Sequence, residues 1–257
     1  MQSYPFALQL YSVRDYCEEN PQAGLRQVKA AGYDYVETAG FYGLGVDLFQ
    51  VMLDAAELTP VSMHIGFESV VGDTETVIQQ ANCLGVAHVV VPWLGEEVCT
   101  NKKQWLMAAE SMNAAGEILA KEGITLSYHN HAHEFERFGE QTIFDLIFSN
   151  ADARNLKLEL DTCWSTVGGA DTLALLQQYA GRVPLVHIKD YKVVEAGKPV
   201  VFTEVGRGVM DWNQVLPAAK AAGAQWFIVE QDESEGDSME SAAVSAAFMK
   251  AQNTTDE

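Results

Sequence analysis

One local pattern recurs along this chain: a helical stretch ends at a glycine, and a short apolar run follows at once. Glycine adopts the left-handed conformation that ends many helices, so each of these positions predicts a helix C-terminus. The runs that follow are continuously apolar, which predicts parallel strands buried on both faces. The pattern appears at Gly32 before Tyr33–Glu37, Gly85 before His88–Pro92, Gly123 before Ile124–His129, Gly181 before Pro184–Lys189 and Gly223 before Trp226–Glu230.

Three further runs, Phe6–Leu10, Pro60–His64 and Leu156–Leu160, bring the predicted strands to eight. Amphipathic stretches such as Trp105–Lys121 and Thr172–Tyr179 predict helices between them. Eight strands alternating with helices in 257 residues favour a closed barrel. No GxGxxG follows the first strand, which argues against a dinucleotide-binding domain. We therefore predict an α/β fold, a single (β/α)8 TIM barrel over residues 1–250, with a frayed polar tail at 251–257.

The charge balance limits the partners of the protein. The chain has 36 acidic and 16 basic residues, a formal net charge of -20, which opposes binding to nucleic acids and to anionic membranes. Its four cysteines form no CxxC pair, and no signal peptide or long apolar span is evident. These features predict a cytoplasmic protein, and they leave a homo-oligomer open.

Polar and aromatic side chains stand where nearly every predicted strand ends. In a TIM barrel these strand ends form the mouth that carries the active site. Burying so many charged groups together is costly unless something compensates them, and a divalent cation is the natural compensator. Mixed carboxylate and imidazole ligation suits Mn, Zn, Co or Fe, and Mg is compatible. The side chains are Gln9, Tyr11, Glu37, His64, Trp93, His129, Asn130, His131, Glu159, Asp161, His187, Lys189, Glu230 and Asp232.

Three of these residues, Asp161, His187 and Glu230, end apolar runs directly and are the predicted metal ligands. A fourth ligand is expected from the run His129–Glu134, which holds three imidazoles and a carboxylate. In an extended chain His129 and His131 point to the same side, and Glu134 lies on the loop beyond.

At these residues the chain resembles a known family. Tyr128–Phe135 resembles the YHNHxxEF signature of a branch of the sugar phosphate isomerase/epimerase family, the xylose isomerase-like TIM barrels. Five further motifs follow the family pattern in the right order across nearly the whole chain. They are Gln9–Arg14 (QLYSVR), Leu158–Trp164 (ELDTxW), His187–Asp190 (HxKD), Gly206–Trp212 (GxGxxDW) and Val229–Asp232 (VEQD).

The resemblance implies one divalent metal held by Asp161, His187, Glu230 and a carboxylate from the fifth strand region. Because His129 stands where the epimerase branches carry a ligand glutamate, we expect Glu134 as the fourth ligand, with His129 or His131 as alternatives. The implied chemistry is proton abstraction next to a carbonyl through a metal-stabilised enediolate. The expected catalytic residues are Glu134, Glu230, His64, His131 and Lys189, and the expected substrate-binding residues are Gln9, Tyr11, Glu37, Trp93, His129, Trp164 and Arg207.

Several functions fit these expectations. The main prediction is an isomerase or epimerase whose small-molecule carbohydrate substrate is a keto sugar or sugar phosphate. A 3-keto-sugar lyase or hydratase would use the same proton abstraction, followed by elimination. An abasic-site endonuclease shares the barrel, but the net charge of -20 opposes it, and the ligand set argues against a non-catalytic sugar-binding barrel. Arg207, within Gly206–Gly208, would either contact a phosphate or lie in a tight turn.

Overall fold

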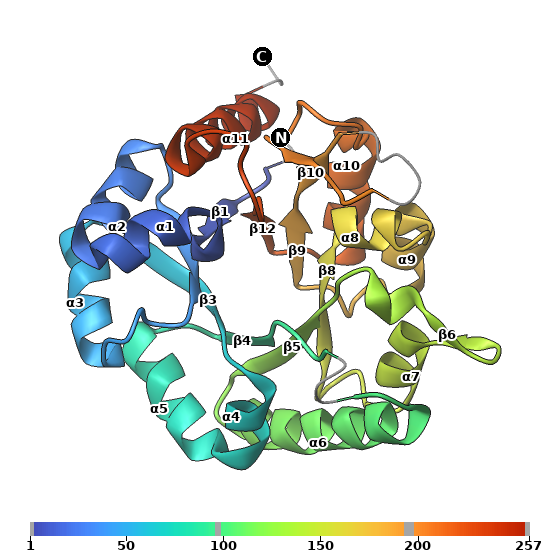
Figure 1. The fold of residues 1–257 in the computed structure, drawn as a ribbon. Coiled ribbons are helices and arrows are strands. Elements are labelled where there is room, and N and C mark those ends of the chain that lie inside the picture. The colour runs from blue at the N-terminus through green and yellow to red at the C-terminus, as the bar shows by residue number, and fades with distance from the viewer. Residues whose placement is uncertain (1–2, 96–98, 193–197, 255–257) are drawn as a thin grey trace.

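Eight parallel strands close into a barrel, in the order β1-β2-β3-β4-β5-β8-β9-β12 and back to β1 (Figure 1). The structure is a computed structural model that describes residues 3–95, 99–192 and 198–254. It confirms the predicted TIM barrel, and all eight predicted strand regions contribute a barrel strand. The strands are β1 (Phe6–Gln9), β2 (Tyr35–Ala39), β3 (Thr59–His64), β4 (His88–Val91), β5 (Thr125–His129), β8 (Lys157–Asp161), β9 (Leu185–Ile188) and β12 (Trp226–Val229).

Helices surround the barrel in a ring, and short elements decorate the loops (Figure 1). The α-helices are α1 (Arg14–Glu19), α2 (Pro21–Ala30), α3 (Val46–Ala55), α4 (Phe67–Gly72), α5 (Thr74–Leu84), α6 (Lys102–Lys121), α7 (Ile143–Ser149), α8 (Thr162–Val167), α9 (Thr172–Gln178), α10 (Trp212–Ala222) and α11 (Ser238–Thr254). Two 3-10 helices, η1 (Leu10–Val13) and η2 (His133–Phe135), follow β1 and β5. Two antiparallel pairs, β6 (Arg137–Phe138) with β7 (Gln141–Thr142) and β10 (Asp190–Tyr191) with β11 (Phe202–Thr203), lie in the loops.

The glycines that the sequence marks as helix ends adopt the expected conformation. Gly85 caps α5 at φ 68° and Gly223 caps α10 at φ 107°, both in the left-handed region. Gly32, Gly123 and Gly181 also have positive φ, just after the ends of their helical segments. The glycine pattern therefore separates helix from strand as predicted.

The barrel interior changes from apolar to polar along its axis. Ala7, Val61 and Ile228 form a small buried cluster inside the barrel. Residues two positions apart on a strand face the same side, so Gln9 lies above Ala7 and Glu230 above Ile228. The polar side chains at the mouth thus lie above a layer of apolar side chains inside the barrel.

The two ends of the chain meet on one side of the barrel, where α11 lies beside η1 and α2 (Figure 1). Asn253 fastens them: its Oδ1 accepts from Tyr4 N at 2.7 Å and its Nδ2 donates to Tyr4 O at 3.1 Å. The last helix therefore continues to Thr254 rather than fraying from residue 251, and residues 255–257 lie outside the described part. Within the described residues, no helix has the length and apolarity to cross a membrane.

Candidate metal centre and catalytic cavity

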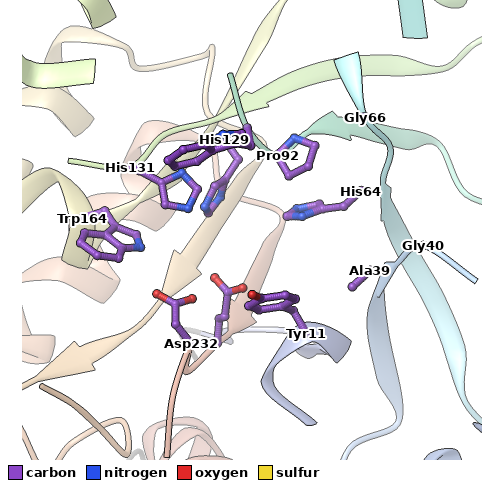
Figure 2. Close-up of a pocket in the computed structure, with 12 residues that line it drawn as sticks. Tyr11, Ala39, Gly40, His64, Gly66, Pro92, His129, His131, Trp164 and Asp232 are labelled. Atoms are coloured by element: carbon purple, nitrogen blue, oxygen red, sulfur yellow. The ribbon is translucent and has the colours of Figure 1, made fainter. Parts of the chain in front are cut away.

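Alternate side chains at the end of β5 point in different directions and have different roles. His129 and His131 both line the cavity at the barrel mouth, as their spacing predicts (Figure 2). Asn130, between them, turns to β8, where its Oδ1 accepts from Asp161 N at 3.0 Å and its Nδ2 donates to Asp161 O at 3.4 Å. The motif thus places two imidazoles in the cavity and uses the amide to hold the neighbouring strand.

Four buried side chains, His129, Asp161, His187 and Glu230, bring one donor atom each to the same place. The four atoms lie within 4.8 Å of one another. His187 Nδ1 is 2.8 Å from Glu230 Oε2, and His129 Nε2 is 3.8 Å from Asp161 Oδ2. The structure thus groups the three ligands predicted from the strand ends with His129. These four side chains form the donor group, the set of candidate metal ligands.

The donor set fits a divalent metal. Asp161 uses Oδ1 to cap α8, accepting from Trp164 N at 2.7 Å. Its Oδ2 is buried and accepts no hydrogen bond, although Lys189 Nζ lies 3.0 Å away. A carboxylate oxygen has room for more than one partner, so Oδ2 can bind a metal ion while it keeps its ion pair with Lys189. Two imidazoles with two carboxylates suit Zn, Mn, Co or Fe.

Glu134, the expected fourth ligand, lies elsewhere. Its Oε1 accepts from Tyr128 Oη at 2.6 Å, and its Oε2 accepts from His131 N at 2.7 Å. Its side chain is fully buried and does not line the cavity, so the structure also removes it from the candidate catalytic groups. Burial raises the pKa of this carboxyl, against the hydrogen bonds and His133, which lower it. Glu134 therefore fastens the loop after β5, and His129, one of the two alternatives, is the fourth member of the candidate ligand group.

Lys189 lies fully buried among three carboxylates beside the donor group. Its Nζ is 2.8 Å from Glu230 Oε2, 3.0 Å from Asp161 Oδ2 and 2.9 Å from Asp232 Oδ1. Burial lowers the pKa of Lys189, but the three carboxylates outweigh it and hold the pKa well above its usual value. Burial raises the pKa of Glu230, but Lys189 and His187 outweigh it and lower the pKa. Lys189 is thus a fixed positive charge behind the cavity wall.

A second polar layer lies beneath the donor group. His64 Nε2 is 2.9 Å from Glu37 Oε1 and 2.8 Å from Glu159 Oε2. Burial lowers the pKa of His64, but Glu37 and Glu159 outweigh it and raise the pKa to about 10. Gln9 donates from Nε2 to Glu37 Oε1 at 2.7 Å.

This layer changes two sequence predictions. Gln9 and Glu37 are fully buried and do not line the cavity, so they support the site rather than contact a substrate as expected. Glu159 was expected at the mouth of the barrel but was not assigned a role, and the structure places it in this layer. Its position two residues before Asp161, on the same face of β8, is the signal that identifies it.

A cavity of about 570 Å³ opens above the donor group. Such a volume is ordinary for a small-molecule site and accommodates a sugar ring. Figure 2 shows the imidazoles of His64, His129 and His131 on one side and the carboxylate of Asp232 on the other. The lining residues are Tyr11, Ala39, Gly40, His64, Gly66, Pro92, Trp93, His129, His131, Trp164, Glu230 and Asp232. Tyr11, Trp93 and Trp164, which were expected to bind the substrate, all line this cavity.

Asp232 was expected at the mouth of the barrel but was not assigned a role there. Its place two residues after Glu230, in the VEQD motif, is the signal for it. Burial raises the pKa of its carboxyl to about 6, although Lys189 lowers it.

Arg207 does not reach this cavity. It lines a separate, smaller pocket, with its guanidinium 4.0 Å from Glu204 Oε2. The loop around it presents no free amides to a phosphate, because Asp190 Oδ2 already accepts from Gly206 N at 3.0 Å and Gly208 N at 3.1 Å. Of the two readings of Gly206–Gly208, the structure supports the turn.

The sequence matches the family of xylose isomerase-like TIM barrels over residues 25–252. A curated relative, the inosose dehydratase of Geobacillus thermodenitrificans, is 26% identical over 171 residues, which are 61% of this chain and 56% of that protein. The inosose dehydratase of Klebsiella pneumoniae strain 342 is 30% identical over 162 residues, 55% of this chain and 52% of that protein. The chain thus spans about half the length of the curated relatives it matches.

Solved structures show the same fold over the whole chain. A sugar phosphate isomerase/epimerase from Parabacteroides distasonis is 25% identical, with a TM-score of 0.80, over 98% of this chain and 95% of that one. The IOLI protein, solved with a bound zinc atom, has a TM-score of 0.69 at 16% identity, over 98% of each chain.

Proposed function

This chain belongs to the xylose isomerase-like TIM barrel family, and from that premise we propose that it is a metal-dependent dehydratase of uncharged keto sugars or keto polyols. The observation that carries the proposal is the division of the cavity into two walls. Figure 2 shows the carboxylate of Asp232 on one side and the imidazoles of His64 and His131 on the other. Glu230 also lines the cavity, and its carboxylate shares the Lys189 ammonium with Asp232. The names of the curated relatives, inosose dehydratases, support the same reaction class.

His129, Asp161, His187 and Glu230 would hold the metal. When bound, the cation would supply Lewis-acid stabilisation of the negative charge that develops next to the substrate carbonyl. Lys189, with its ammonium 2.8 Å from Glu230 Oε2, keeps that carboxylate anionic and adds positive charge to the same wall.

Dehydration needs one group that accepts a proton and one that delivers a proton. On the carboxylate wall, Glu230 or Asp232 takes the proton from the carbon next to the carbonyl. The C–O bond on the following carbon then breaks, and His64 on the opposite wall, which Glu37 and Glu159 keep protonated, delivers the proton that lets the hydroxyl leave as water. Burial and Lys189 lower the pKa of His131, so this neutral imidazole holds the hydroxyl by a hydrogen bond instead. The product is the unsaturated ketone, or the diketone that forms from it when the double bond carries a hydroxyl group.

Epimerisation in this fold is expected to use two metal-bound carboxylates that exchange protons with the substrate carbon. The turn of Glu134 away from the cavity leaves Glu230 without that partner, which is why elimination is the better proposal. The likeness to an isomerase/epimerase structure keeps epimerisation as the second candidate.

An uncharged substrate fits the lining of the cavity. Among the described lining residues there is no lysine or arginine. A phosphate would face the carboxylates of Glu230 and Asp232, and the amides of Gly206 and Gly208 could not bind it because they are bonded to Asp190.

Proton NMR in heavy water tests the proposal. Protein loaded with Mn, Co, Zn or Mg is incubated with a keto-inositol, with a 3-keto hexose and with the corresponding phosphates. We expect loss of the proton next to the carbonyl together with one equivalent of water, on the uncharged compounds only. Formation of an epimer that carries solvent deuterium, without elimination, would instead establish the second candidate.

A further inference from the structure

Glu37 is fully buried and does not line the cavity, yet four side chains, those of Gln9, Ser62, His64 and His187, point donors at its carboxylate. Oε1 accepts from Gln9 Nε2 at 2.7 Å and from His187 Nε2 at 2.8 Å, and it lies 2.9 Å from His64 Nε2. Oε2 accepts from Ser62 Oγ. A carboxylate is the one common side chain that accepts on all sides, so a glutamine here would turn an N–H toward a donor.

The pairing of β2 with its two neighbouring strands places Glu37 beside its hydrogen-bond partners. The β2–β3 pairing shifts between Val36 and Glu37, so that Val36 pairs with Pro60 but Glu37 pairs with Ser62, and Val61 is left over. Bulges of this kind re-aim side chains near active sites. On its other side Glu37 pairs in register with Gln9 of β1. The shift therefore sets the residues that bond to Glu37 directly beside it.

The bond from His187 to Glu37 decides which nitrogen of His187 is free. A neutral imidazole has one N–H and one lone pair. Both nitrogens of His187 face carboxylates: Nε2 lies 2.8 Å from Glu37 Oε1 and 3.1 Å from Glu159 Oε2, and Nδ1 lies 2.8 Å from Glu230 Oε2. Because Glu230 is itself a candidate ligand, a metal bound there would take the lone pair of Nδ1 and leave the hydrogen on Nε2, where Glu37 accepts it. We infer that Glu37 is a positioning residue that fixes the tautomer and ring orientation of His187, so that Nδ1 faces the metal. Outer carboxylates have this role in many metal sites.

The same layer could instead be read as a second cation site, since His64, His129, Glu159 and His187 also bring donor atoms close together. His187 and His129 belong to both groups. Each would need a lone pair on both ring nitrogens, which a neutral imidazole lacks. Hydrogen bonding to Glu37 needs only one proton, on Nε2 of His187, and leaves Nδ1 for a single metal.

The inference rests on the metal centre of the proposed function, but its test uses no substrate. Zinc is the probe, because it is diamagnetic. In zinc-loaded, ¹⁵N-histidine-labelled wild-type protein, we expect long-range ¹H–¹⁵N spectra to show His187 with its proton on Nε2 and the metal on Nδ1. Metal on Nε2 would overturn the inference without the need for any variant.

Two variants on one strand complete the test. For Glu37→Gln we expect the affinity for zinc, measured against a chromophoric chelator, to fall about 10- to 100-fold. Thr38→Val is the matched control: Thr38 is the next residue of β2, and its buried Oγ1 has no hydrogen-bond partner. We expect its zinc affinity to stay within about threefold of the wild type.

Unchanged zinc affinity in Glu37→Gln would refute the positioning role, and so would two zinc ions per wild-type chain with one seen at Glu37 and His64 by anomalous diffraction. If the wild-type protein bound no zinc, manganese or cobalt, the metal centre itself would be wrong. That result is distinct from the failure of the Glu37 inference alone.

Discussion

The side-chain amide of Asn130 bonds to the backbone of Asp161 and so continues the pairing of β5 with β8 beyond the last backbone pair. The backbone pairing of β5 with β8 ends at His129 and Glu159. One residue on, the Asn130 amide accepts from Asp161 N at 3.0 Å and donates to Asp161 O at 3.4 Å. The two candidate ligands His129 and Asp161 are thereby held at a fixed separation at the mouth.

The Asn130→Ala variant should weaken metal binding although Asn130 is not a ligand. Without the amide, the backbone of Asp161 loses two buried hydrogen bonds, and its carboxylate is free to shift relative to His129. We expect zinc affinity to fall about 10-fold by competition with a chelator, as for other outer-shell residues. Asn113→Ala is the control, because Asn113 Oδ1 also accepts a backbone bond, from Asp152 N at 2.8 Å, at an exposed place away from the cavity. Equal affinities in the two variants would contradict the role of Asn130.

Asp161→Asn separates the two tasks of one carboxylate. Oδ1 caps α8 through Trp164 N, and an asparagine caps a helix about as well as an aspartate. Oδ2 faces the donor group, and an amide there is a far weaker metal ligand. We expect the variant to fold and to lose measurable zinc binding in elemental analysis after dialysis. Asp171→Asn, at the N-cap of α9, is the control that keeps full occupancy. A fully occupied Asp161→Asn protein would remove Asp161 from the ligand set.

The barrel was predictable because its signals are local. Gly85 and Gly223 end their helices in the left-handed conformation whatever surrounds them, and the apolar runs after them need only a buried position. The strand-end ligands follow from the same reasoning, since the carboxyl ends of parallel strands meet at one mouth.

The orientation of Glu134 was not predictable in this way. It depends on Tyr128 Oη, which reaches across the loop to the Glu134 carboxylate, and no spacing rule encodes that reach. The role of Glu37 was hidden for a similar reason. Its partners depend on a register shift between β2 and β3 that leaves no mark in the pattern of apolar residues.

A pair of variants decides which residue completes the donor group. Glu134→Gln keeps a side chain that can accept from His131 N, and it should bind zinc within about threefold of the wild type, because Glu134 lies outside the donor group. His129→Ala should lose most of its zinc affinity, since Nε2 is one of the four donor atoms. Isothermal titration of both apo-proteins measures the two affinities. The opposite ranking would restore Glu134 as the ligand.

Asp190 should matter for stability rather than for metal binding. Its buried carboxylate accepts from Gly206 N, Gly208 N, Met210 N at 3.1 Å and Trp212 Nε1 at 2.9 Å. Asparagine would turn an amide N–H toward these donors and leave at least one of them unsatisfied. We expect Asp190→Asn to lower the free energy of unfolding by about 3 kcal/mol in urea titrations.

The control for Asp190 is Asp211→Asn, in the same segment but exposed, which should change the free energy of unfolding by no more than about 0.5 kcal/mol. A loss for Asp190→Asn as small as that of the control would mean that the loop does not depend on this carboxylate.

His88, the first residue of β4, should make the free energy of unfolding depend on pH. Burial lowers its pKa, although Gln225 and Glu37 raise it, and the net direction is down. The folded protein therefore binds fewer protons at His88 than the unfolded chain does. Its contribution to stability is complete above the unfolded pKa of about 6.5 and is lost as the pH falls toward the folded pKa.

We expect the unfolding free energy of the wild type to drop between pH 8 and pH 5 by more than that of His88→Gln, which cannot titrate. Parallel urea titrations of both proteins at the two pH values isolate this contribution, because every other titrating group is shared. An equal drop in both proteins would show that His88 keeps its ordinary pKa in the fold.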